Sequence, residues 1–269
     1  MIVFPNAKIN IGLNIVEKRP DGYHNIESCF YPVGWSDALE ITAAGQFDFQ
    51  SDGIAIPGNN ADNLCVQAYH MLAADYALPP VQMHLLKAVP IGAGLGGGSS
   101  DAAFAIKALN QQFNLRISFE KQLDYARRLG SDCAFFILDK PAYCFEKGDR
   151  FEEIDLKLRG KWIVLVNPGI HISTIEAYAG INPQPGRSDL RNVLQQPVSK
   201  WKDQVKNDFE ATLFPKYPLL QKIKDDLYES GAAYAAMSGS GSTLYGIFEN
   251  EKDLKKHFSK FKVWQGFLS

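Results

Sequence analysis

A run of glycines between residues 90 and 100 is the clearest chemical feature of the sequence. Five of the seven positions from Gly92 to Gly98 are glycine, and two serines follow directly. Because glycine loses more backbone entropy on ordering than any other residue, this cluster predicts left-handed backbone or a very close approach to the backbone. Where such a loop enters a helix, unpaired amides and hydroxyls bind an anion. The run therefore predicts a phosphate-binding loop, made of Pro90, Ile91, Gly92, Ala93, Gly94, Leu95, Gly96, Gly97, Gly98, Ser99 and Ser100.

Other glycine-rich nucleotide motifs fit this loop less well. A P-loop needs a lysine after its last glycine, and none follows here. Gly92, Gly94 and Gly97 match the dinucleotide fingerprint, but no strand ending in an acidic residue is predicted in the segment after them. Protein kinases carry His-Arg-Asp and Asp-Phe-Gly, which are absent from the sequence. A glycine-rich turn without a ligand is the remaining alternative.

Two charged side chains are candidates for chemistry beside a bound phosphate. Lys8 shares the polar face of the first predicted strand with Asn10, and on this pattern alone a solvated strand lysine is the favoured interpretation. Asp132 follows a predicted helix end and precedes the apolar run 133–138, where it acts either at a cleft floor or as a helix cap. Asp101, directly after the two serines, is expected to cap the helix that the loop enters.

The elements that must position these residues follow from hydrophobic periodicity. Residues 2–16 alternate between apolar and polar side chains, which predicts a half-buried strand. The rest of the first half contains predicted strands 23–33, 39–41, 47–49 and 81–87, and predicted helices 63–76 (capped by Asp62), 101–110 and 119–129.

The second half has the element order of a ferredoxin-like domain, β-α-β-β-α-β, with helical insertions. Its predicted elements are strand 162–166, helices 189–195 and 219–229, strands 232–237 and 243–248, helix 252–258 and strand 263–268. The sequence thus predicts an α+β protein of two domains, residues 1–155 and 156–269, with the active site in the cleft between them and the boundary between residues 151 and 161.

Size and composition agree with this organisation and exclude several classes of function. A chain of 269 residues suggests two domains, and 46% hydrophobic residues are typical of a globular protein. A net charge of −2 without basic clusters argues against nucleic acid as a partner. Without a long apolar segment, neither a signal peptide nor a membrane span is expected, which predicts a cytoplasmic protein. Four scattered cysteines and five unpaired histidines favour neither disulfides nor a transition-metal site.

Three segments together resemble the motifs of the GHMP kinases: residues 5–10, the glycine-rich loop and residues 237–242. More narrowly, residues 19–24 (Arg-Pro-Asp-Gly-Tyr-His) and the loop through Asp101 resemble the family of 4-diphosphocytidyl-2-C-methyl-D-erythritol kinases. The resemblance covers nearly the whole chain and extends to residues 168–169, Thr174 and residues 207–210. It implies an N-terminal domain like domain 2 of ribosomal protein S5 and a C-terminal ferredoxin-like domain.

The resemblance also implies the reaction and its residues. ATP and Mg²⁺ would phosphorylate the 2-hydroxyl of diphosphocytidyl methylerythritol, a step of nonmevalonate isoprenoid precursor synthesis. Lys8 and Asp132 would be catalytic, with Asp132 as the general base. The implied ATP-binding residues outside the loop are Asn63 and Lys87, and the implied substrate-binding residues are Asn10, Tyr23, His24 and Thr174.

Other interpretations of these implied residues stay open. Asn63 and Lys87 could equally be a helix-cap neighbour and a strand-end charge, and residues 238–242 could close over the phosphates or form a plain hairpin loop. After Asp132 the family commonly has Val-Pro, whereas this chain has Cys133 and Ala134. Neither the Mg²⁺ ligands nor the choice between monomer and homodimer follow from the sequence. The competing functions are a homoserine, mevalonate or galactose kinase, and a nucleotide sensor that has lost transfer.

Overall fold

The computed structural model describes residues 1–185 and 189–269. They form two compact units built from interleaved segments of the chain. Unit 1 contains residues 1–7, 35–91 and 96–140, and unit 2 contains residues 8–34, 92–95 and 141–269. The glycine-rich loop is thus shared, because residues 92–95 belong to unit 2 and the chain from Gly96 belongs to unit 1. The predicted division at residue 155 stays a prediction.

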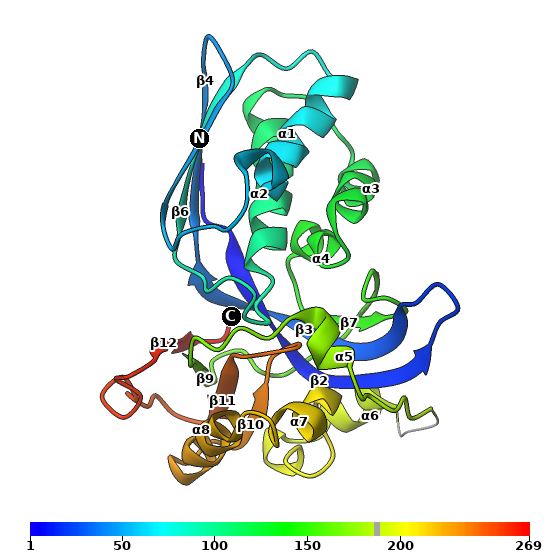
Figure 1. The fold of residues 1–269 in the computed structure, drawn as a ribbon, viewed down its shortest axis with the longest axis vertical. Coiled ribbons are helices and arrows are strands. Elements are labelled where there is room, and N and C mark those ends of the chain that lie inside the picture. Colours follow the sequence, from blue (N-terminus) through cyan, green and yellow to red (C-terminus); the bar gives the residue numbers. More distant parts are fainter. Residues whose placement is uncertain (186–188) are drawn as a thin grey trace. The chain divides into compact units, whose positions relative to one another are not determined.

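Unit 1 is a four-stranded sheet with helices packed on one face (Figure 1). The strand order is β1-β4-β6-β5, antiparallel except for the pair β5 and β6. Its strands are β1 (Ile2–Val3), β4 (Ala38–Ala43), β5 (Asp48–Gly53) and β6 (Val81–Lys87). Its helices are η1 (Asn60–Asp62), α1 (Leu64–Asp75), α2 (Gly97–Gln112), α3 (Phe119–Leu129) and α4 (Cys133–Leu138).

Small apolar side chains bring α2 into the centre of unit 1. Ala102, Ala105 and Ile106 are fully buried, and the helix packs against α1, α3, α4 and β4. The alternating burial of β6 supplies the opposing surface, with Val81 and Met83 also fully buried. The sheet and the surrounding helices therefore fix the position of α2 and of its first turn.

Two predictions about helix starts in this unit are wrong. α2 begins at Gly97 rather than at residue 101, so part of the glycine run is helical. The cap of α1 is Asn63, whose Oδ1 accepts the Cys65 N–H at 2.9 Å, and not Asp62. Asp62 instead lies in the short turn η1.

The first sheet of unit 2 has the strand order β2-β3-β7-β8. Its strands are β2 (Asn6–Lys18), β3 (His24–Ser36), β7 (Ala142–Phe145) and β8 (Arg150–Glu153). The prediction of a half-buried first strand is wrong, because residues 7–15 are all buried. The polar side chains Lys8, Asn10 and Asn14 are covered as well, since partners distant in the sequence pack over them.

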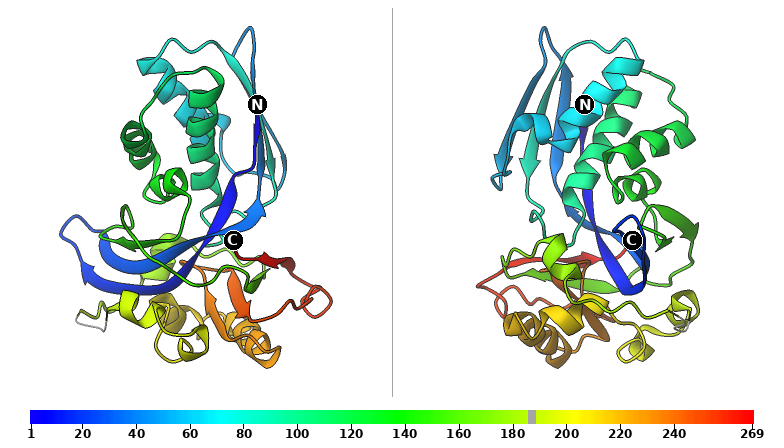
Figure 2. Two further views of the ribbon diagram at one scale, coloured as in Figure 1. Left: turned by 180° about the vertical axis from the view of Figure 1, so that it is seen from behind. Right: turned by 45° about the vertical axis from the view of Figure 1, so that its right-hand side comes forward.

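The second sheet of unit 2 is antiparallel, with the strand order β10-β11-β9-β12. This is the order of a ferredoxin-like domain. The four strands are labelled in Figure 1, and Figure 2 shows the same part of the chain in two further views. Its strands are β9 (Trp162–Asn167), β10 (Tyr234–Met237), β11 (Leu244–Phe248) and β12 (Lys262–Phe267). The helices of unit 2 are α5 (Thr174–Tyr178), α6 (Leu190–Leu194), η2 (Val198–Lys200), α7 (Asp208–Leu213) and α8 (Pro218–Glu229).

The predicted helix at residues 252–258 is wrong. This segment forms turns, although Phe258 N–H donates to Leu254 O at 3.0 Å as in a single helical turn. Leu254 and Phe258 reach the core of unit 2 without a longer helix, and nucleating a short helix is costly. The predicted α+β class is confirmed. Among the described residues, no helix is long and apolar enough to cross a bilayer.

Candidate active site

Three different structural features explain why these positions of the loop are glycine. Gly92, Gly94 and Gly96 have φ values of +60°, +77° and +68°, and they alternate with the buried side chains of Ala93 and Leu95. Left-handed backbone of this kind favours glycine, as the sequence predicts. The loop is therefore anchored by two apolar side chains, with glycine at each turn between them.

Close packing explains why positions 94 and 97 are glycine. Gly98 differs, because neither packing nor backbone conformation requires a glycine there. A Cβ at Gly94 would lie 1.9 Å from the Ser238 carbonyl oxygen, and one at Gly97 would lie 2.9 Å from Lys87 Nζ. Gly98 is exposed, has an ordinary helical φ, and would place a Cβ within 4 Å of nothing. Its lack of a side chain is not needed by the fold, and it leaves the start of α2 open to another molecule.

The first turn of α2 has a geometry that suits an anion. Gly96 is the N-cap, and the Ser100 N–H donates to the Gly96 carbonyl at 2.9 Å, which closes the first turn. The amides of Gly97, Gly98 and Ser99 precede this bond and have no acceptor within the helix. Together with the dipole of a 16-residue helix they favour a negative group.

Lys8 is buried in unit 2, with 3% of its surface exposed, which overturns the alternative of a solvated lysine. Its Nζ donates to Asn10 Oδ1 at 2.6 Å and to the Gly94 carbonyl at 3.4 Å, and lies 4.6 Å from the centre of the Phe30 ring. Its backbone N–H donates to the Leu95 carbonyl at 2.9 Å. These contacts hold a positive charge beside the first half of the loop.

Asn10 orients this lysine. Its Nδ2 donates to Ser28 Oγ at 3.0 Å, so its Oδ1 faces the Lys8 ammonium. Its backbone is fixed too, because its N–H donates to Ser238 Oγ at 3.2 Å and its carbonyl accepts from the Tyr245 hydroxyl at 2.9 Å. Direct substrate binding by Asn10 stays a prediction.

The Gly/Ser turn, residues 238–242, packs onto the loop within unit 2. Ser238 Oγ donates to the Gly94 carbonyl at 2.8 Å, and the Thr243 N–H donates to the Ala93 carbonyl at 3.3 Å. Both side chains are fully buried. The turn is thus more than a hairpin connection, because it fixes the backbone of the first half of the loop.

Asp132 lies at the N-terminal end of α4 in unit 1. Its side chain makes no capping hydrogen bond to that helix, so the alternative of a helix-capping role is not observed. The neighbouring Cys133 thiol, whose pKa is raised by burial, hydrogen-bonds the Ser99 side chain in the first turn of α2. Because α4 also packs on α2, Asp132 sits at the end of α4 that contacts the anion-binding turn.

The departure from the family pattern after Asp132 does not disturb this geometry. α4 begins at Cys133, so Ala134 lies in its first turn. Proline is tolerated in the first turn of a helix, because the missing N–H has no acceptor there. Both versions of the segment therefore suit the same helix start.

Lys87 is held by two buried carboxylates of unit 1. Its Nζ contacts Asp37 and lies 2.7 Å from Asp101 Oδ2, and only 3% of the residue is exposed. Asp37 also accepts the Val89 N–H at 2.8 Å. The cluster therefore links the end of β6 to α2 close to Gly97. An ATP contact for Lys87 stays a prediction, and its observed contacts are structural.

Asp101 is not a helix cap, which corrects the prediction. α2 starts at Gly97, so Asp101 lies in the second turn and pairs with Lys87. Burial raises the pKa of Asp101, and the nearby Asp37 carboxylate raises it further while Lys87 opposes the shift. Burial lowers the pKa of Lys87, but the two carboxylates more than offset this and leave it raised.

Among the predicted substrate residues of unit 2, His24 lies in a stacked pair of rings. The His24 ring lies on Tyr178, with 4.5 Å between centroids and 21° between planes. Burial and the charge of Lys18 lower the pKa of His24, so the ring is neutral near pH 7. Tyr23 is 63% exposed, and Thr174 is the exposed first residue of α5, the helix that ends at Tyr178.

The structure adds residues that the sequence did not single out. Asp37 and Tyr178 have no motif around them, and they join the site only through contacts distant in the sequence. Within unit 2, Lys8, Asn10, Gly94 and the Gly/Ser turn come together, as do His24 and α5. Lys8 and Asp132 belong to different units, and their pairing stays a prediction.

Known proteins share this fold and these motifs. The model of the GHMP kinases N terminal domain matches residues 63–140, and that of the GHMP kinases C terminal domain matches residues 191–262. A crystal structure of 4-(cytidine 5'-diphospho)-2C-methyl-D-erythritol kinase superposes with a TM-score of 0.85 at 27% identity, covering 99% of this chain and 98% of that one. Fold and site therefore define a small-molecule kinase of the GHMP class.

Curated relatives that match over nearly the full length of the chain identify its family within this class. The 4-diphosphocytidyl-2-C-methyl-D-erythritol kinase of Cytophaga hutchinsonii is 53% identical over 254 residues, 94% of each chain. The protein of the same name from Bacteroides fragilis is 50% identical over 260 residues, 95% of each chain. The chain belongs to the family of 4-diphosphocytidyl-2-C-methyl-D-erythritol kinases, and the family predicted from the motifs is confirmed.

Proposed function

We propose that this chain transfers the γ-phosphoryl group of ATP to the 2-hydroxyl of 4-diphosphocytidyl-2-C-methyl-D-erythritol, a step of nonmevalonate isoprenoid precursor synthesis. The observation that carries the proposal is the open first turn of α2 at Gly98, joined to a loop whose Gly94 carbonyl contacts the buried Lys8 ammonium. The names of the relatives supply the acceptor, since they act on this cytidyl compound by name.

The triphosphate would bind to the amides of Gly97, Gly98 and Ser99. Among the described residues, no cluster of three or more acidic, histidine or cysteine side chains suits a metal ion. Mg²⁺ usually takes most of its ligands from phosphate oxygens and water, with one or two protein oxygens. The hydroxyls of Ser99 and Ser100 suit this, since Ser100 Oγ is buried without a hydrogen-bond partner among the described residues. When bound, Mg²⁺ neutralises charge on the phosphates.

Lys8 and Asp132 would act on the acceptor hydroxyl. As general base, Asp132 takes the proton of the attacking hydroxyl, and the Lys8 ammonium offsets the charge that develops on the phosphoryl oxygens. The Asn10 amide keeps this ammonium in one orientation. Their joint action across the two units is part of the proposal.

The cytosine would be recognised by unit 2. The neutral His24 ring has one face covered by Tyr178, so its nitrogens are left to hydrogen-bond a base edge. The exposed ring of Tyr23 suits stacking on a pyrimidine. Thr174, in the same helix as Tyr178, offers a hydroxyl to the rest of the substrate.

A coupled assay of ADP release across four acceptors tests the proposal. We expect turnover with 4-diphosphocytidyl-2-C-methyl-D-erythritol and none above background with mevalonate, homoserine or galactose. Preferred turnover of one of the other three would reject the cytidyl substrate. ATP binding without turnover of any acceptor would favour a nucleotide sensor.

A further inference from the structure

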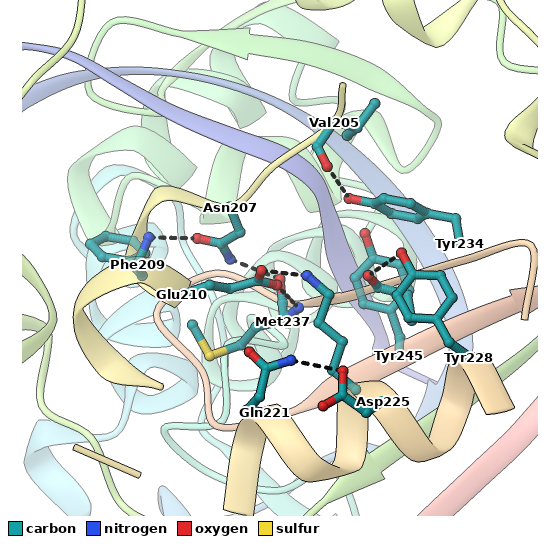
Figure 3. Close-up of polar contacts among 12 residues, drawn as sticks. Val205, Asn207, Phe209, Glu210, Gln221, Asp225, Tyr228, Tyr234, Met237 and Tyr245 are labelled. Carbon is teal, nitrogen blue, oxygen red and sulfur yellow. Dashed lines mark hydrogen bonds and ion pairs between the residues drawn. The ribbon is translucent and has the colours of Figure 1, made fainter. Parts of the chain in front are cut away.

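Side chains at the N-terminal end of α7, Asn207 and Glu210, hold the Gly/Ser turn that contacts Gly94. Figure 3 shows this network, with Asn207, Glu210 and Met237 at its centre. Asn207 Nδ2 donates to the carbonyls of Met237 and Gly239, both at 2.8 Å. Its Oδ1 accepts the Phe209 N–H at 3.0 Å, which fixes the orientation of the amide.

Glu210 completes the support of Met237. Its Oε1 accepts the Met237 N–H at 2.8 Å, and its Oε2 pairs with Lys224 Nζ at 2.5 Å. Met237 ends β10, an edge strand of its sheet, so its outward N–H and carbonyl have no neighbouring strand. The N-cap residue of α7, Asn207, and Glu210 in its first turn therefore satisfy the backbone of this edge, as an additional strand would.

The same segment is tied to the strand that carries Lys8. The Leu13 N–H donates to the Lys206 carbonyl at 2.8 Å, and the Ile15 N–H donates to Asp208 Oδ2 at 2.7 Å. Residues 206–210 thus bind β2 on one side and the Gly/Ser turn on the other. They set the spacing between the two parts of the chain that converge on the Gly94 carbonyl.

A short chain of hydrogen bonds leads from Asn207 and Glu210 through the Gly/Ser turn to the Gly94 carbonyl and to Lys8. Ser238 follows Met237 directly, donates to the Gly94 carbonyl and accepts the Asn10 N–H. A Cβ at Gly239 would lie 3.2 Å from Asn10 Oδ1, the atom that accepts from Lys8. A displacement of the turn would therefore shift both the loop backbone and the Lys8 ammonium.

We propose that Asn207 and Glu210 are positioning residues for phosphoryl transfer, which act through Ser238 on Gly94 and Lys8. The proposal rests on the proposed kinase function, because it assigns a role to this loop and this lysine. Misplacement of a catalytic group by about 1 Å costs about 10²-fold in rate, so a network that touches no substrate can control turnover.

A double-mutant cycle tests this path. Asn207→Asp keeps the shape and the acceptor for Phe209 but places a carboxylate against two carbonyl oxygens. We expect it to lower kcat by about 10- to 100-fold at saturating substrates. In a Ser238→Ala background the same change should cost less than threefold, because the path is already broken. Equal losses in both backgrounds would overturn the proposal, since independent sites combine additively.

Glu210 gives a second comparison, which tests the proposal even when the Asn207→Asp variant does not fold. Glu210→Gln keeps an acceptor for the Met237 N–H, and Lys224 lines a groove of about 800 Å³ in which its ammonium can be hydrated. We expect kcat within threefold of wild type for Glu210→Gln and a loss of tenfold or more for Glu210→Leu. Equal kcat values in the two variants would also overturn the proposal.

Two controls separate positioning from general stability. Asp226→Asn breaks the Lys222–Asp226 pair on the surface of α8, the helix that carries Lys224, and should leave kcat and Tm unchanged. Leu254→Ala weakens the core of unit 2 away from the turn, and its kcat should stay near wild type. If it loses as much kcat as Asn207→Asp at a similar Tm, the effect is one of stability and the proposal fails.

The affinity for a non-hydrolysable ATP analogue, measured by calorimetry, requires no acceptor. We expect Asn207→Asp to weaken it in the wild-type background and not in Ser238→Ala. Absence of ATP-analogue binding to the wild-type protein would reject the proposed function itself. Binding to wild type that the Asn207→Asp change weakens equally in both backgrounds would reject only the positioning role.

Discussion

Two lysines of this protein are equally buried and differently surrounded. Lys8 in unit 2 and Lys87 in unit 1 each expose 3% of their surface. Lys87 touches two carboxylates of its own unit, Asp37 and Asp101. Within unit 2, Lys8 touches an amide oxygen, a backbone carbonyl and an aromatic ring. The two lysines therefore reach the same degree of burial through different contacts within their own units.

The surroundings imply different roles for the two charges. The carboxylates around Lys87 neutralise it and tie β6 to α2, so its contribution is to folding. Within unit 2, Asn10 and the Gly94 carbonyl orient the Lys8 ammonium beside the loop, which suits a group that stabilises a transferring phosphoryl. The predictions below test this division, from the largest expected effect to the smallest.

Removing the predicted base should have the largest effect on turnover. We expect Asp132→Asn to lower kcat by about 10²–10⁴-fold, the usual contribution of a positioned general base. The variant should remain folded, because asparagine is nearly isosteric with aspartate. Near-normal turnover in a steady-state assay would remove the catalytic role from this end of α4.

Lys8→Met should separate catalysis from stability. Loss of a preorganised charge typically costs about 10²–10³-fold in kcat, and we expect a loss of that size. The free energy of unfolding should change by no more than about 2 kcal/mol, because methionine fills the space, and within unit 2 the oxygens that lose a donor are those of Asn10 and Gly94. A large loss of stability with kcat preserved would reverse the roles of the two lysines.

Lys87→Met should show the opposite pattern. It leaves two buried carboxylates without their cation, which typically costs about 3–5 kcal/mol in unfolding free energy. Urea unfolding measures this cost, and the affinity for an ATP analogue should change little at a temperature where the variant is folded. Unchanged stability with weakened ATP binding would instead support the predicted ATP contact of Lys87.

The sequence predicted most of the elements and the loop, because periodicity and glycine spacing are local properties. It placed the start of α2 too late, since glycines usually disfavour helices, while at residues 97–98 they allow close packing on Lys87 and an open helix start. The burial of Lys8 and the pairing of Lys87 with Asp37 could not be predicted, because each depends on residues about 20 to 90 positions away.

The exposed ring of Tyr23 in unit 2 allows a test of substrate recognition, separate from the tests of the two lysines. Stacking of a base on an aromatic ring is worth about 1–3 kcal/mol, so Tyr23→Ala should raise the KM of the cytidyl substrate by roughly 5- to 150-fold. The KM of ATP should change little. Equal changes in both KM values in initial-rate measurements would contradict cytosine recognition by Tyr23.

Counted per pH unit, the smallest effect concerns the carboxylates around Lys87. Burial raises the pKa of Asp101 from 3.8 to about 7, so the folded state binds its proton more tightly than the unfolded state. Stability from this group therefore increases as the pH falls from above 7 toward 4, by at most about 1.4 kcal/mol per pH unit.

Asp101→Asn removes this titration and keeps the Asp37 pair. Urea unfolding of both proteins between pH 8 and pH 5 should show wild type gaining stability relative to the variant as the pH falls. A difference that is constant with pH would mean that Asp101 is ionised throughout, and that Lys87 compensates both carboxylates fully.

A crystal structure with a non-hydrolysable ATP analogue and the cytidyl substrate tests the central claim most directly. The account predicts the triphosphate on the amides of Gly97, Gly98 and Ser99, with Lys8 Nζ and an Asp132 carboxylate oxygen within hydrogen-bonding distance of the phosphoryl group and the 2-hydroxyl. A triphosphate bound away from this turn, or a 2-hydroxyl out of reach of both side chains, would contradict it.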